Sequence, residues 1–279
     1  MNCKTLLVHL DDSTRSAARL DYALDVAARH DAHLIGLYAV CEVLTEPLFL
    51  QGEDRWSAAC EAQRDRNLRS AQAAFFAAAE RAGCSAEWRA PGGPPTAAAI
   101  LHARHADLLI LGQFDARDTG AYVARQFVED LIMGAGRPAI VLPYAGPIRP
   151  QMDNMMIAWD GGRESARAAT DALPLLRRAS FVTVLKVHSQ RHGQPLHDKP
   201  AGIDVAAWLE RHGVKASFTA IPKVAGVDTG ATLLNALADR HIDLLVMGAY
   251  GHARVQERLL GGVTRTVLEA MTVPVLMSH

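Results

Sequence analysis

The sequence repeats itself at a fixed offset. The segment HADLLILG at residues 105–112 agrees with HIDLLVMG at residues 241–248 in five of eight positions. The same offset of 136 residues carries Pro138 onto Pro274, each inside a short apolar segment. Upstream, HLDDSTRSAARLDYAL aligns with AWDGGRESARAATDAL at an offset of 149 residues. A repeat of roughly 140 residues is as long as one typical domain, so we expect two similar domains.

The repeat places the first domain at residues 1–146 and the second at residues 152–279. The segment YAGPIRPQMDN between them holds two prolines and one glycine, which interrupt regular structure and indicate a linker. The larger offset upstream means that the first half carries 13 additional residues. We place them within residues 41–64, as a longer loop or helix start.

Each half alternates between strand-like and helix-like segments. In the second half NMMIAWD is a short apolar segment, RESARAATDALPLLRRA has apolar residues at helical spacing, and SFVTVLKV is rich in β-branched residues. Apolar strands separated by amphipathic helices are typical of a parallel sheet that is covered on both faces. The sequence therefore predicts an α/β fold of two tandem, doubly wound, five-stranded parallel sheets.

The composition excludes several classes of partner. Lys and Arg number 29 against 30 for Asp and Glu, so no net field attracts a polyanion, and we expect no nucleic acid partner. Apolar runs end well before 18 residues and the N-terminal segment MNCKTLLVHLDDS soon reaches charge, so we expect a cytoplasmic protein with no membrane segment. The four cysteines include no C-x-x-C pair, which indicates reduced thiols and no zinc site.

Four glycines interrupt the helix-forming segment MGAYGHARVQERLLGGVTRTVLEA. Gly248 directly follows a predicted strand and Gly251 stands three residues later, where a missing Cβ lets a ligand approach the backbone. Gly261 and Gly262 precede a predicted helix, so their amides favour an anion, and Thr264 can add a hydroxyl donor. Turns and helix caps alone would explain the same glycines. A phosphate site at the carboxyl end of a strand is the alternative that agrees with ligand binding in such sheets.

This pattern of Gly-x-x-Gly, nine residues and Gly-(Ser/Thr) resembles the ATP-binding signature of the universal stress protein family. Gly248, Gly251 and Gly261 match it, whereas Gly262 stands where nucleotide-binding members usually have Ser or Thr. The resemblance covers nearly the whole chain, twice. It implies the strand order 3-2-1-4-5 in each sheet and pairing of domains through their last strands. The nucleotide-binding residues that it implies are Asp160, Val187, Met247, Gly248, Gly251, Gly261, Gly262, Val263 and Thr264.

Some of these residues have a second interpretation. The resemblance implies that Asp160 contacts the adenosine part of the ligand, but an acidic residue after a first strand also serves as a helix cap. Trp159 either stacks on a base or, as packing statistics favour, fills space above the sheet.

The first half departs from the pattern. Gly112 is present, but Asp115 stands in place of the second glycine, and no Gly-Gly or Gly-Ser precedes the next helix. A carboxylate at that position opposes a phosphate. Asp11 is retained, although a cap would account for it. We expect the first half to be a structural or regulatory copy.

No other group of residues indicates chemistry as clearly. His188, His192 and His197 have a spacing that a metal could use, but Gly193 and Pro195 interrupt any helix there, so we expect polar loop histidines and no metal. No residue stands out as a general base for hydrolysis, so we expect any turnover to be slow or absent.

Three functions remain as hypotheses. In the first, the second half binds ATP or a related adenine nucleotide, and occupancy is a regulatory signal in a stress response. In the second, the protein is an interaction scaffold that binds no nucleotide, as Asp115 and Gly262 suggest. In the third, it hydrolyses a nucleotide slowly. The two halves can pair within the chain, and a homodimer is a further hypothesis.

Overall fold

The structure of the protein, a computed structural model, describes residues 3–41, 53–118, 120, 123–188, 204–223, 226–251 and 262–279, with the side chains of 53–60 excepted. It forms two compact units, Cys3–Ala135 and Gly136–His279. The division precedes the predicted linker because β5 (Ala139–Leu142) pairs antiparallel with β10 (Val275–Ser278) and so groups with the second unit. The domain boundaries drawn from the repeat, 1–146 and 152–279, stay a prediction.

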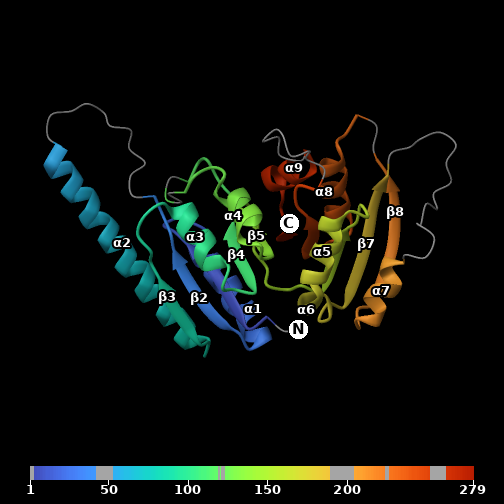
Figure 1. Cartoon of the computed structure of the whole chain (residues 1–279), viewed down its shortest axis with the longest axis horizontal. Helices are drawn as coiled ribbons and strands as arrows, with labels where there is room; N and C mark the ends of the chain where they lie inside the picture. The colour runs from blue at the N-terminus through green and yellow to red at the C-terminus, as the bar shows by residue number, and fades with distance from the viewer. Residues whose placement is uncertain are drawn as a thin grey trace. The chain divides into compact units, whose positions relative to one another are not determined.

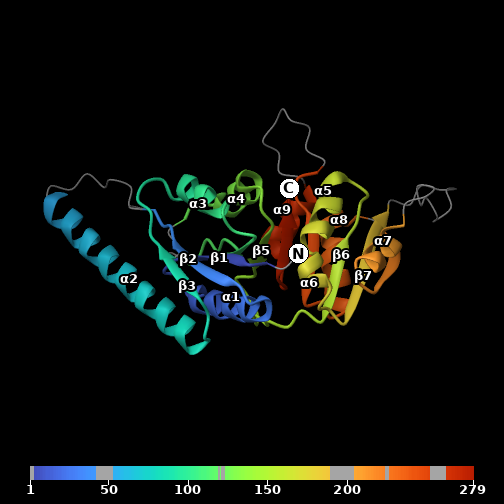
Figure 2. The same ribbon diagram turned by 60° about the horizontal axis from the view of Figure 1, so that its bottom comes forward.

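The first half has the predicted alternation of strands and helices. Its elements before β5 are β1 (Thr5–Leu10), α1 (Ser16–His30), β2 (His33–Tyr38), α2 (Glu53–Arg81), β3 (Ala86–Arg89), α3 (Pro95–Ala103), β4 (Leu108–Gly112) and α4 (Phe127–Ala135). The strands follow the order β3-β2-β1-β4-β5, which confirms the predicted order 3-2-1-4-5. Helices α1 and α2 lie on one face of this sheet and α3 and α4 on the other (Figure 2).

The second half repeats this architecture. Its elements are β6 (Asn154–Ala158), α5 (Arg163–Asp171), α6 (Leu173–Leu176), β7 (Phe181–His188), α7 (Val205–Arg211), β8 (Ala216–Pro222), α8 (Thr229–Asp239), β9 (Leu244–Gly248), α9 (Gly262–Ala270) and β10. The parallel pairings run β8-β7-β6-β9-β10, again the order 3-2-1-4-5 in its own numbering. Helix α8 packs beside α9 (Figure 1).

The apolar pattern explains which strands are central. Strand β1 is buried from Leu6 to Leu10, and strands β4 and β9 are buried up to their terminal glycines, as expected for parallel strands covered on both faces. The edge strand β8 is mostly exposed or half-buried. Among the residues that the structure describes, no helix is both long enough and apolar enough to cross a bilayer.

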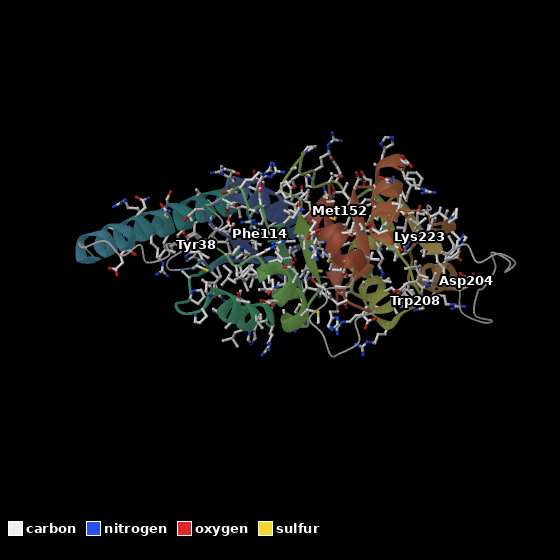
Figure 3. All side chains as sticks on the ribbon, turned by 90° about the horizontal axis from the view of Figure 1, so that it is seen from above. Tyr38, Phe114, Met152, Asp204, Trp208 and Lys223 are labelled. Carbon is white, nitrogen blue, oxygen red and sulfur yellow. The ribbon has the colours of Figure 1, made fainter. Side chains whose placement is uncertain are left out.

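Asp side chains begin two helices of the second half. Asp204 accepts hydrogen bonds from the backbone N–H of Ala206 and Ala207 at 3.0 and 3.2 Å, and Trp208 follows one turn into α7 (Figure 3). Asp228 accepts from Ala231 N at 3.0 Å and starts α8 in the same way. Such caps satisfy the amides that a helix leaves free at its start.

The additional residues of the first half belong partly to a long helix. Of the predicted insertion 41–64, residues 42–52 lie outside the described residues and residues 53–64 form the first turns of α2. Near the other end of α2, the Phe75 ring packs over β2 so closely that a Cβ added at Gly36 would lie 2.7 Å from it. This contact attaches α2 to the sheet.

Phe75→Ala should therefore destabilise the protein by about 3–5 kcal/mol, because it removes a fully buried ring and leaves a cavity over β2. The adjacent Phe76 is 43% exposed, and Phe76→Ala should cost about 1 kcal/mol or less. Urea unfolding followed by circular dichroism measures both. Equal losses would show that α2 is not attached through Phe75.

Candidate functional site

The candidate site of the second half lies where β6 and β9 end. These strands are neighbours in the sheet, with Ala158 opposite Met247, and the chain leaves them toward α5 and α9. Met247 is buried, and it also lies opposite Met277 of β10. In the sheet order β10-β9-β6-β7, the connection after β6 leads to β7 on one side and the connection after β9 leads to β10 on the other. In open α/β sheets, ligands bind at the strand ends where connections leave in opposite directions.

Gly248 and Gly251 face the first turn of α5. A Cβ at Gly248 would lie 2.5 Å from the backbone carbon of Glu164 and 2.6 Å from Ser165 N. The absence of a side chain at Gly248 is thus required by helix packing, whether or not a ligand is present. A Cβ at Gly251 would meet the Glu164 carboxylate oxygen Oε2 at 2.7 Å, which is the mobile end of a side chain rather than backbone.

Thr264 is connected to the chain that follows β9. Its hydroxyl oxygen accepts a hydrogen bond from Tyr250 N at 3.2 Å, and Thr264 is buried in the first turn of α9. Tyr250 adopts a φ of 62°, in the left-handed region that favours glycine. Ala249 N donates to Ser278 O at 2.8 Å, so this turn is held by both α9 and β10.

Asp160 closes the turn that leads into α5. Its Oδ1 accepts hydrogen bonds from Gly162 N and from the Ser165 hydroxyl, each at 2.7 Å. The N-cap residue of α5 is Gly162, with no side-chain cap, so Asp160 fixes the turn that precedes the helix. Asp160 itself remains exposed to solvent.

The other predicted residues are distributed as follows. Val187 lies within β7, opposite Ile221 of β8, and is half-buried. Gly262 and Val263 are the first residues of α9, exposed and half-buried respectively. Gly261 lies outside the described residues.

Glu164 is the residue of this site that the sequence prediction missed. Its side chain is only about 10% exposed, and it forms an ion pair with the far more exposed Arg163. Burial would raise the pKa of Glu164, but hydrogen bonds from Arg163 and from its own backbone N–H, together with the charges of Arg163 and His279, lower it overall. The carboxylate is therefore ionised at neutral pH. Its only signal in the sequence is an acidic residue in a first helical turn, which is a common feature on its own.

The corresponding place in the first half is filled by a side chain. An added Cβ at Gly112 would lie 1.9 Å from Nη1 of Arg19, so the guanidinium covers this glycine. Arg19 Nη2 donates to Asp11 Oδ1 at 2.6 Å, and both side chains are about 4% exposed. In the aligned repeat, Ala168 stands at the position of Arg19.

His9 completes this buried cluster. Its Nε2 lies 2.9 Å from Ala39 O, which requires the proton on Nε2, and its Nδ1 lies 3.8 Å from Asp11 Oδ2. Burial, helped by the Arg19 charge, lowers the pKa of His9 to about 4 against the opposing effects of Asp11 and Ala39. The histidine is thus neutral at physiological pH.

The Asp115 carboxylate is hydrogen-bonded to a residue close in sequence, Arg117. It accepts hydrogen bonds from Arg117 N at 3.0 Å and from the Arg117 guanidinium at 3.1 Å. Among the residues that the structure describes, no group of three or more His, Cys, Asp or Glu side chains could hold a metal ion. Of the three histidines with metal-like spacing, His188 ends β7, and His192 and His197 lie outside the described ranges.

Arg19→Ala should destabilise the protein by about 3–5 kcal/mol, because it leaves the Asp11 carboxylate buried without its counter-charge. Arg29→Ala is the matched control: it removes a surface ion pair with Asp25, in which both side chains are more than a third exposed, and should cost about 0.5 kcal/mol or less. Adding Asp11→Asn to Arg19→Ala should recover part of the loss. Equal effects of Arg19→Ala and Arg29→Ala in chemical denaturation would contradict the buried pair.

The His9 pKa also predicts a pH dependence of stability. Since its folded value, about 4, lies below the ordinary 6.5, the unfolded chain takes up the proton first, and stability falls as the pH drops from about 6.5 to about 4. Between pH 7.5 and pH 5 this contributes a loss of about 2 kcal/mol. His9→Gln retains a donor for Ala39 O but does not titrate, so its loss over the same interval should be smaller by that amount. Identical losses in wild type and variant would disprove the assignment.

Comparison with known proteins agrees with the repeat. The family model described as the universal stress protein family matches residues 2–143 and again residues 152–279. A universal stress protein from Archaeoglobus fulgidus has a similar structure, with a TM-score of 0.72 and 17% identity over 98% of this chain and 95% of that chain. A functionally unknown protein from Pseudomonas aeruginosa gives a TM-score of 0.58 and 14% identity over 99% of this chain and 92% of that chain.

A curated relative is similar over one half only. The universal stress protein Slr1230 of Synechocystis is 26% identical over 149 residues, which are 53% of this chain and 49% of that protein. The match thus spans about half the length of this relative. Likenesses to solved structures at 14–17% identity establish the fold alone.

Proposed function

This chain belongs to the universal stress protein family, as a tandem of two such domains, and from that premise we propose that its second half binds an adenine nucleotide as a regulatory signal in a stress response. The ligand is ATP or a related adenine nucleotide. The proposal includes a cytoplasmic location, as the sequence predicts, and pairing of domains.

One observation carries this proposal: the two halves differ at the ends of their fourth strands. In the first half the Arg19 guanidinium covers Gly112 and is neutralised by Asp11. In the second half the aligned position is Ala168, and the nearest atom to a Cβ at Gly251 is the end of the Glu164 side chain. Gly248, the counterpart of Gly112, is instead covered by the α5 backbone, so the second half offers a ligand the backbone at Gly251, whose counterpart in the first half is Asp115.

The proposed binding groups surround this position. The backbone amides near Gly251 and at the start of α9, from Gly261 to Val263, would hold phosphate oxygens, because helix N-termini favour anions. Thr264 would assist through its hydroxyl proton, since its oxygen already accepts from Tyr250 N. Asp160, Val187 and the Met247–Gly248 strand end would position the nucleoside.

Hydrolysis is not part of the proposal. A general base works best when its pKa lies near the working pH. Glu164 is the buried carboxylate beside Gly251, and its pKa is lowered by Arg163 and by its own amide. It is thus a poor proton acceptor.

Glu164 also favours a second candidate function. A carboxylate against Gly251 opposes phosphate, as expected for an interaction scaffold that binds no nucleotide. In that case neither ATP, ADP nor AMP would bind, and isothermal titration calorimetry separates the two functions directly.

Saturating nucleotide should raise the melting temperature of the wild type by roughly 5 °C, which corresponds to a ligand at about 100 times its Kd. Gly251→Glu should abolish this shift, since it places a second carboxylate in the site, while its Cβ meets only a mobile side-chain end. Ser217→Glu adds the same charge at an exposed position of β8 and should keep the shift. A shift of the same size in Gly251→Glu would rule out this site.

A further inference from the structure

We infer that Glu164 makes the second-half site select an adenine ligand of low negative charge, a nucleoside or a nucleotide with one phosphate, over a free polyphosphate. This inference rests on the proposed nucleotide binding and specifies which ligands the site accepts. Glu164 is accordingly a specificity-determining residue.

The position of the carboxylate is the first support. Glu164 belongs to the first turn of α5, whose backbone packs directly on Gly248. From there its Oε2 reaches Gly251, to within 2.7 Å of where a Cβ would stand. Gly251 itself is exposed to solvent. A ligand that reaches the Gly251 backbone from solvent therefore meets this carboxylate.

The surroundings of Glu164 favour its ionised form. The Arg163 guanidinium pairs with Oε1, and the N-terminus of α5 favours a negative charge in its first turn. The side chain is also about nine-tenths buried, so its field is screened less than that of a surface carboxylate. Glu164 thus keeps its negative charge at neutral pH.

Among the described neighbours of Glu164, Arg163 and His279 bring opposite charge near its carboxylate. Arg163 is 84% exposed, and water screens it strongly. Asp160 adds a second carboxylate to the same turn through its hydrogen bond with Ser165. Arg265, in α9, is paired with Glu269 at 2.9 Å. Each phosphate added to the ligand therefore brings further negative charge toward the Glu164 and Asp160 carboxylates.

The fold does not need an acidic residue at this position. In the aligned repeat, Arg15 corresponds to Glu164, and α1 has no acidic residue in its first turn. Helix α1 nevertheless forms beside β1 and β4. Glu164 is therefore explained better by the properties of the site than by helix formation.

The test compares ligand charge with the charge at residue 164. Adenosine, AMP, ADP and ATP are titrated calorimetrically into wild type, Glu164→Gln and Arg163→Gln, with EDTA present so that no divalent cation neutralises the phosphates. The wild type should bind AMP more tightly than ATP. Glu164→Gln should raise the ratio of ATP to AMP affinity about tenfold, because the ligand charge no longer faces a carboxylate.

Two further variants make the outcome specific. Arg163→Gln removes a cation from an exposed side chain, so it should leave the fold intact and lower the same ratio. Glu210→Gln removes an exposed carboxylate of α7 and should leave the ratio unchanged.

Tighter wild-type binding of ATP than of AMP, or an unchanged ratio in Glu164→Gln, would overturn the inference while nucleotide binding stands. Absence of binding by all four ligands to wild type and Glu164→Gln would instead refute the proposed function.

Discussion

The close contact between the end of a fourth strand and the helix that follows the first strand is the constraint on which each site depends. In the second half no Cβ fits at Gly248, because the backbone of Glu164 and Ser165 occupies that space. The contact follows from the strand order, which makes β6 and β9 neighbours. It also determines where the first turn of α5 directs its side chains, and hence why the Glu164 carboxylate lies against Gly251.

Asp11 and Asp160 are equivalent in the repeat but have different surroundings, because one half has Arg19 where the other has Ala168. In the first half Arg19 extends over Gly112, and a buried cation requires a counter-charge, so Asp11 is only 6% exposed. The aligned position in α5 is Ala168, which carries no charge. Asp160 stays at the surface and closes the turn into α5. The repeated Asp is thus part of an ion-pair core in one half and of a solvent-exposed turn in the other.

The sequence predicts the fold well because its signal is distributed over many residues. Buried parallel strands leave continuous apolar segments, and both halves have the same pattern, so the prediction of the α/β class depends on no single residue. The strand order 3-2-1-4-5, which the family resemblance implies, is confirmed. The site is harder to predict. The glycine spacing predicts that a ligand approaches the backbone at Gly248. The contact of Gly248 with the α5 backbone, however, depends on a distance between segments far apart in the sequence. The burial of Glu164 and Arg19 likewise arises from strands far away in sequence.

These contacts also determine at which glycine a substitution tests ligand binding. Any side chain at Gly248 must displace the α5 backbone, so its substitution disturbs the fold before it affects binding. Among the described residues, a side chain at Gly251 meets the end of Glu164, which can rotate away. A ligand that approaches the Gly251 backbone must likewise displace the end of the Glu164 side chain, or bind beside its carboxylate. Space at Gly251 and charge at Glu164 are therefore coupled, and the ligand best suited to both is small at this point and carries little negative charge.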